Sequence, residues 1–265
     1  LASSVRVRWA AHEVFHFSDG SKGATNALAE INRLAGIRSW AYRNAPDLIV
    51  LGRTALKLDA DPKLVLDKLY HPAREHDPNF AGTAQAIGDL ALSKSDYELA
   101  GRTFQLALKR HPKNADLHFG AARAFAPSDG KTMTQHLQAT LTANPNHAGA
   151  RLLMADRLID REAYDEAETQ LSKVLAVNPH HPEAWAYRGV IAHLRADTNA
   201  ERKAREQALA HWKTNPRVDH LIGKKLSQKY RFAEGSAHQK QALAFDEKYL
   251  PAKIQLAQDL LRLGF

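Results

Sequence analysis

The stretch AGTAQAIGDLALSKSDYELAGRTFQLALKRHPK, residues 81–113, contains two apolar segments separated by the polar turn KSD and followed by a proline. In both segments small and apolar residues recur three or four positions apart, as at Ala100 and Phe104, which places them on one face of a helix. Because Pro112 lacks an N–H and clashes with the preceding turn, it ends the second helix. The stretch therefore predicts two antiparallel helices joined by a short turn.

This pattern repeats along the chain. A small residue recurs in register in six apolar stretches, first after 33 residues and then at every 34 residues. These six positions are Gly88, Ala121, Ala155, Gly189, Gly223 and Ala257. Where two helices pack closely, a large side chain would push their backbones apart, so a small residue is expected at each crossing. A period of 33 or 34 residues is typical of stacked helix pairs.

The composition agrees with an all-helical fold. Hydrophobic residues make up 44% of the 265 residues and charged residues 25%, so there is enough apolar surface for a continuous core. Alanine and leucine are abundant while runs of valine, isoleucine and threonine are scarce, which favours helix over strand. The chain has no cysteine, which excludes disulfides, thiolate metal sites and cysteine nucleophiles. Cysteine usage therefore does not indicate the redox compartment of the protein.

The repeated positions resemble those of the tetratricopeptide repeat family. Within residues 81–113, Gly88, Ala100, Phe104, Ala107 and Pro112 stand where that family places its small, aromatic and breaker residues. The resemblance implies an all-α fold, a right-handed α-α superhelix of about seven helix pairs followed by one helix without its second partner. It weakens over 216–249, where Gly235 and Gln239 replace an alanine and a bulky residue.

The resemblance divides the chain into an array over 81–265 and a preceding region over 1–80, together forming one continuous solenoid. The expected units of the array are 81–113, 114–147, 148–181, 182–215, 216–249 and a partial unit, 250–265. In the region 1–80 helix pairs without the motif are expected at roughly 3–17 with 24–35 and 46–58 with 62–76, with Pro72 kinking the last helix. The chain begins with Leu1 and stops inside an apolar helical pattern, so we expect it to be part of a longer protein.

The family resemblance also implies a binding surface, because first helices of successive pairs line a concave groove in such arrays. The residues expected to face this groove are Gln85, Asp89, Leu92, His118, Phe125, Asp156, Val190, His193, His220 and Lys224. Repeats that hold acidic C-terminal tails use lysine and asparagine where this chain has Gln85 and Asp89, which argues against that ligand. The mixture of acidic, histidine and apolar residues suits a protein or extended peptide partner, or a companion domain of the same polypeptide.

A second reading begins from the sequence HEVFH at residues 12–16. His12 and His16 lie one helical turn apart, as zinc ligands do, with Glu13 available as a general base. Catalytic zinc takes three protein ligands, and Asp19 and Lys22 stand where one such enzyme class has glycine and a third histidine. We therefore expect HEVFH to be part of an ordinary helix, and a zincin-type metalloenzyme is the alternative.

The remaining sequence features favour a non-catalytic scaffold without a cofactor, metal ion or small-molecule substrate. No phosphate-binding or nucleophile motif such as GxxxxGK[ST] or GxSxG occurs. The net charge of +8 is spread along the chain without a basic block, which disfavours nucleic acid as a partner, and no apolar run is long enough to cross a membrane. A further alternative is that this chain is the accessory region of an enzyme whose catalytic domain lies C-terminal to it.

Overall fold

The computed structural model describes residues 44–265, and within them every regular element is helical. The chain divides after Ala143 into two compact units. The sequence HEVFH and the helices expected over 3–17 and 24–35 lie outside the described residues. The predicted all-α fold class is confirmed for the part that the structure describes.

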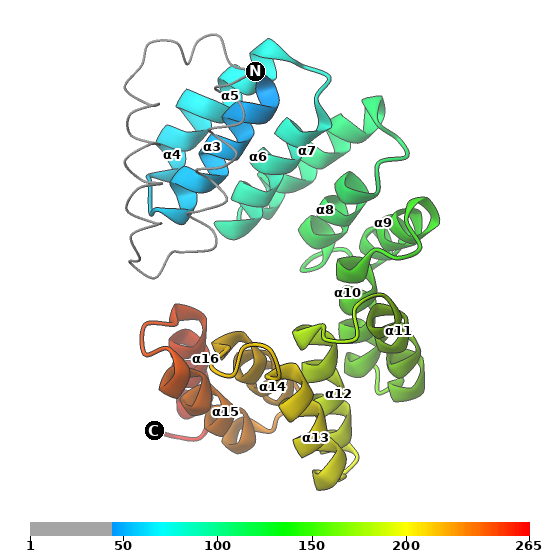
Figure 1. Ribbon diagram of the computed structural model, residues 1–265, viewed down its shortest axis with the longest axis vertical. Coiled ribbons are helices and arrows are strands. Elements are labelled where there is room, and N and C mark those ends of the chain that lie inside the picture. Colours follow the sequence, from blue (N-terminus) through cyan, green and yellow to red (C-terminus); the bar gives the residue numbers. More distant parts are fainter. Residues whose placement is uncertain (1–43) are drawn as a thin grey trace. The chain divides into compact units, whose positions relative to one another are not determined.

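The first unit contains consecutive antiparallel helices that pack side by side (Figure 1). Its described elements are α3 (Ala45–Lys57), α4 (Pro62–Val65), the π-helical turn η2 (Leu66–Tyr70), α5 (His71–His76), α6 (Ala81–Ser93), α7 (Tyr97–Arg110), α8 (Ala115–Phe125) and α9 (Gly130–Ala143). Each of the pairs α6–α7 and α8–α9 has the length and turn that the 33-residue pattern predicts. Two hydrophobic clusters form the core, one around Tyr70 and one around Phe104.

The helix expected over 62–76 contains a π-helical turn just before Pro72. The N–H of His71 donates to the carbonyl of Leu66, five residues earlier, instead of four. Pro72 has no N–H with which to continue the α-helical pattern, and π-turns accommodate such interruptions. The predicted irregularity at Pro72 is therefore a change of hydrogen-bond spacing in α4–η2–α5.

The second unit repeats the same antiparallel pairing three times and adds a single helix. Its elements are α10 (Ala148–Asp160), α11 (Tyr164–Val177), α12 (Pro182–Leu194), α13 (Thr198–Ala208), α14 (Pro216–Gln228), α15 (Phe232–Phe245) and α16 (Leu250–Arg262). One continuous hydrophobic cluster runs from α10 to α14 and includes Ile159, Leu171, Val190 and Ile222, each 0% exposed. First helices α10, α12 and α14 contact one another in sequence order, which places their side chains on one shared surface.

The divergent repeat over 216–249 keeps the fold through its two unusual residues. A methyl group on Gly235 would overlap the Ser227 hydroxyl and approach the carbonyl of Gly223, so glycine permits the close crossing of α14 and α15. Gln239 fills the space of the bulky residue and is fully buried. Its amide donates to the His220 carbonyl at 3.2 Å and accepts from the His220 ring at 2.8 Å, which satisfies the buried polar atoms.

The turns between first and second helices contain a left-handed residue, except for the turn between α8 and α9. Asp59, Ser95, Glu162, Ala196 and Tyr230 have φ between 58° and 64°. This conformation closes a helix at its C-terminal end, and it is usually adopted by glycine. None of the described helices is long and apolar enough to span a membrane.

Candidate partner-binding site

A pocket of about 290 Å³ lies on the surface formed by the first helices α10, α12 and α14. It extends to Tyr249 at the start of α16. Three residues that the sequence analysis assigns to the groove line this pocket, namely Asp156 of α10 with His220 and Lys224 of α14. The structure therefore brings together groove residues that are up to 68 positions apart in the sequence, and we take this pocket as the candidate site.

A buried lysine, Lys225, lines the pocket. The Lys225 ammonium lies 2.7 Å from a carboxylate oxygen of Asp156 and 2.9 Å from one of Asp160, and only 3% of its side chain is exposed. Tyr187 of α12 donates its hydroxyl to Asp156 at 3.0 Å. Burial, together with the Asp156 carboxylate, raises the pKa of Tyr187 well above its ordinary value, so this hydroxyl stays a donor. These contacts fix the Asp156 carboxylate in place.

His220 forms a neutral wall of the pocket. Its Nδ1 donates to Gln239, and its ring meets the Tyr249 ring edge-on with centroids 5.6 Å apart. Burial lowers the pKa of His220, the hydrogen bond with Gln239 partly opposes this, and the charges of Lys224 and Arg217 lower the pKa further. At neutral pH the imidazole is therefore uncharged and contributes an aromatic surface.

The rim of the pocket carries exposed cations. Arg217 is paired with Glu183 at 2.6 Å across α14 and α12. Lys224 is exposed and has no ion-pair partner among the described residues. A free ammonium beside an aromatic wall can bind a carboxylate or a backbone carbonyl of a partner, so the rim offers charge and the wall offers apolar contact.

Most of the predicted groove residues of the first unit contact other residues of the same unit. Asp89 accepts from Arg123 at 2.9 Å, joining α6 to α8. Phe125 stacks on the His136 ring of α9 with centroids 6.0 Å apart. Gln85 and Leu92 are half-buried on α6.

His118 is likewise turned towards its own unit. Its Nε2 donates to the Pro112 carbonyl at 3.0 Å, so its Nδ1 accepts from His136 Nδ1 at 2.9 Å. Burial, followed by the adjacent His118, lowers the pKa of His136, which favours the neutral form of the His136 imidazole. The pair therefore joins α8 to α9.

In the second unit Val190 and His193 lie away from the pocket. Val190 is 0% exposed and packs in the hydrophobic core, so it has no surface to offer a partner. Within the same unit the His193 ring nitrogen lies 3.1 Å from a carboxylate oxygen of Glu201 on α13. Val190 has the register of a groove residue, but it is a core residue because neighbouring helices cover it.

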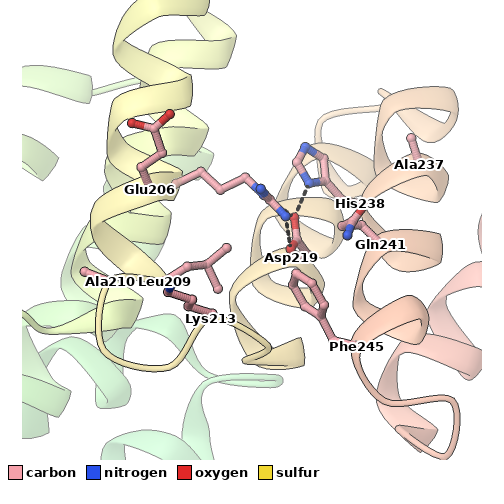
Figure 2. Close-up of a pocket in the computed structure, with 10 residues that line it drawn as sticks. Glu206, Leu209, Ala210, Lys213, Asp219, Ala237, His238, Gln241 and Phe245 are labelled. Carbon is pink, nitrogen blue, oxygen red and sulfur yellow. Dashed lines mark hydrogen bonds and ion pairs between the residues drawn. The ribbon is translucent and has the colours of Figure 1, made fainter.

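A second charged cluster lies between α13, α14 and α15, beside a cavity of about 570 Å³ (Figure 2). Asp219 of α14 is fully buried, and its two carboxylate oxygens each accept a hydrogen bond from Arg205 at 2.8 Å. Figure 2 also shows His238 of α15 turned towards Asp219, to which its Nδ1 donates at 2.9 Å. Burial raises the pKa of Asp219, but the hydrogen bonds from His238 and Arg205 outweigh it and hold the pKa below its ordinary value.

Sequence reasoning missed both Lys225 and the Asp219 cluster. The partners of Lys225 are 65 and 69 residues away, and those of Asp219 are 14 and 19 residues away, so no short motif contains them. A local sign exists for Lys225, which stands on the apolar helical stripe between Ile222 and Leu226. A lysine on such a stripe is buried only when it is paired.

The described residues contain no group of three or more histidine, cysteine, aspartate or glutamate side chains that could hold a metal ion. The HEVFH sequence is outside that range. In the described part, the two polar clusters join side chains of neighbouring helices through hydrogen bonds and ion pairs.

Comparisons with known proteins agree with this architecture. Two tetratricopeptide repeat family models match residues 86–131 and 134–191. No curated protein matches the sequence. A tetratricopeptide repeat protein from Parabacteroides merdae is 15% identical with a TM-score of 0.61, and the match covers 96% of this chain and 99% of that one. The Cut9–Hcn1 structure of the APC/C is 14% identical with a TM-score of 0.63, and the match covers 97% of this chain and 54% of that one.

Proposed function

Because this chain is a tetratricopeptide-repeat-containing protein, we propose that it binds an extended segment of a partner protein along the first helices α10, α12 and α14. The repeats make the chain a scaffold, and the proposal assigns the binding to the pocket that Asp156, His220 and Lys224 share. The partner is a separate protein or a companion domain of the same polypeptide. In this proposal the chain supplies a surface and catalyses no reaction.

The observation that carries this proposal is that three successive first helices contribute to one pocket. Each helix provides a different kind of contact: Asp156 on α10 an acceptor, Tyr187 on α12 a half-buried aromatic side chain, and Lys224 on α14 an exposed cation. An extended peptide needs such alternating contacts along its length, because its own side chains and carbonyls alternate. A pocket of this size accepts one side chain, and the helices on either side extend the surface.

Site-specific photo-crosslinking tests this assignment. A photoreactive amino acid replaces Lys224, and in a matched variant it replaces Lys240, which is exposed on second helix α15. We expect a defined crosslinked product from position 224 and none from position 240. In the full-length protein an intramolecular product identifies a companion domain, and an intermolecular product identifies a separate partner.

The crosslinked partner is then purified and its affinity is measured by titration calorimetry. Lys224→Glu reverses the free charge on the rim and should weaken binding about tenfold or more. Lys240→Glu makes the same charge change on α15 and should leave the affinity unchanged. Equal crosslinking from both positions, or an affinity that is indifferent to Lys224→Glu, would show that the partner binds elsewhere.

A further inference from the structure

The first unit contains a cleft between the loop after α5, the N-terminal half of α6 and the C-terminal half of α7. We call it the basic cleft. It has a volume of about 330 Å³, at the low end of the size range of ligand pockets. Its floor is apolar and includes Phe80, Ile87 and Leu106. Leu106 is 62% exposed.

All the charged residues that line the basic cleft are cations. The cations Arg74, Lys109 and Arg110 line the cleft, and none of its lining residues is acidic. Arg110 donates to the Pro78 carbonyl at 2.9 Å, which holds its guanidinium at the edge. Among the described residues no carboxylate lies within ion-pair distance of Arg74, Lys109 or Arg110. The cleft therefore has a positive potential that its own fold does not neutralise.

The N-terminus of α6 adds to this potential. Phe80 occupies the cap position without a side-chain hydrogen bond, and the first turn of the 13-residue helix contains no acidic residue. The backbone N–H groups at Ala81 and Gly82 point out of the helix end, where they attract anions. Several other helices of the chain have such groups capped, for example α7 by Asp96 and α8 by Asn114.

An unsatisfied hydroxyl lies among the residues that line the cleft. Thr83 is 3% exposed, and its Oγ1 has no hydrogen-bond partner in the part of the chain that the structure describes. A buried hydroxyl without a partner costs roughly 1–3 kcal/mol, so such groups are rare in folded proteins. A bound ligand with a polar atom beside an apolar side chain would satisfy it.

We propose that the basic cleft is a docking site for an acidic peptide segment of another protein, with a large apolar side chain next to its carboxylates. The apolar side chain fills the floor beside Leu106, while the carboxylates pair with Lys109 and Arg110 and with the first-turn amides of α6. A backbone group of the peptide reaches the Thr83 hydroxyl. Charge complementarity selects this occupant, because a basic or purely polar peptide would leave the rim charges or the apolar floor without a partner.

This site is separate from the pocket on α10, α12 and α14, so the two proposals fail independently. The probe is the labelled peptide EELDEFEE, whose binding is measured by fluorescence anisotropy. Two control peptides are EESDESEE, without apolar side chains, and KKLKKFKK, with the charge reversed. We expect binding of the first peptide at least roughly tenfold tighter than of either control, and weaker binding as salt rises from about 50 to 300 mM.

Matched variants assign the binding to the cleft. Lys109→Glu should weaken peptide binding by roughly fivefold or more, whereas Lys113→Glu makes the same change at an exposed residue outside the cleft and should have no effect. Leu106→Ser should weaken it similarly, with Leu64→Ser as the control at another exposed leucine. Lys224→Glu should leave this binding unchanged.

Thr83→Val distinguishes a ligand contact from a structural role. It removes the unsatisfied hydroxyl at nearly constant shape, so the melting temperature should stay constant or rise while peptide affinity falls severalfold. An affinity that Thr83→Val leaves unchanged would remove the hydroxyl from the proposal. Equal binding of all three peptides would refute the docking site, as would binding of dodecanoate without binding of EELDEFEE, because the occupant would then be a fatty-acid-like amphiphile.

Discussion

The Phe104 ring is fully buried between two glycines, Gly88 of its own helix pair and Gly120 of the next. A methyl group on either glycine would overlap the ring, so the small residues of the repeat form a slot for an aromatic side chain. At Gly189 the same register position is more open, with Ile222 at 3.7 Å and Ala204 at 3.9 Å from an added methyl carbon. The repeat thus predicts where a small residue stands, whereas the partner side chain decides how small it has to be.

Gly88→Ala and Gly189→Ala should therefore change the free energy of unfolding in opposite directions. The added methyl at Gly88 overpacks the slot and should lower the free energy of unfolding by about 1–3 kcal/mol. At Gly189 alanine makes ordinary contacts and restricts the unfolded chain, so stability should stay constant or rise by up to about 1 kcal/mol. Urea unfolding followed by circular dichroism measures both, and equal losses would contradict the slot.

Asp219 is the second residue whose role depends on its partners. Asp219→Asn should lower the free energy of unfolding by about 2–4 kcal/mol at pH 7, because it leaves Arg205 and His238 without the carboxylate that pairs them. Asp165→Asn is the control, since the Asp165 side chain is 94% exposed and its pair with Arg195 should contribute almost nothing.

The difference in stability between wild type and Asp219→Asn should depend on pH, because the carboxyl of Asp219 has a shifted pKa. In the folded protein the pKa lies below the ordinary value of 3.8, so as pH falls the unfolded chain takes up the proton first. The stabilisation is complete above about pH 5 and disappears as pH falls through the folded pKa. Melting curves of wild type and Asp219→Asn should converge as pH falls through the folded pKa of Asp219, and a constant difference would show that the charge is unimportant.

At the scale of the element, the helices follow from the sequence more closely than the turns do. Apolar periodicity and Pro112, Pro145 and Pro179 are local signals, so the bounds of α6 to α11 can be predicted from neighbouring residues alone. The left-handed turn residues carry no such signal, because positions 95, 162, 196 and 230 hold serine, glutamate, alanine and tyrosine instead of glycine. The short distance between the two helices imposes this conformation on side chains that disfavour it.

Ala196→Gly should therefore stabilise the protein. Ala196 has φ of 58°, which costs roughly 1–2 kcal/mol for a residue with a Cβ, and glycine removes this strain at a smaller entropic cost. We expect a gain of about 0.5–1 kcal/mol in thermal or urea unfolding. Ala237→Gly, in the middle of α15, should instead cause a loss of about 0.5–1 kcal/mol, and similar effects at both positions would contradict this interpretation.

At the scale of the whole molecule, a solenoid is held together by contacts between successive helix pairs. In the second unit Lys225 departs from this rule, because α14 reaches α10 past the intervening pair α12–α13. Lys229 does the same through Glu162 at 3.0 Å. The candidate site could be predicted in part, since Asp156, His220 and Lys224 belong to first helices in register. The long-range ion pairs could not be predicted, because they join repeats two periods apart and the period does not indicate which side chains pair.

Lys225→Met tests this connection. Removal of the ammonium leaves Asp156 and Asp160 without their shared partner, and since both carboxylates are partly exposed we expect a loss of about 1–2 kcal/mol. Lys224→Met changes the adjacent exposed lysine and should not alter stability. A double-mutant cycle with Asp160→Asn should give a coupling energy of about 1 kcal/mol, and additive effects would contradict the connection.

The reach of Lys225 past one helix pair has a mechanical consequence. If the chain were pulled from its ends, helix pairs that touch only their immediate neighbours would peel away one at a time at low force. The segment from α10 to α14 is instead bridged across α12–α13 by the Lys225 and Lys229 contacts, so that middle pair is shielded until these contacts break. In an optical-trap experiment wild type should then extend through this segment in a single large step, and Lys225→Met in several smaller ones.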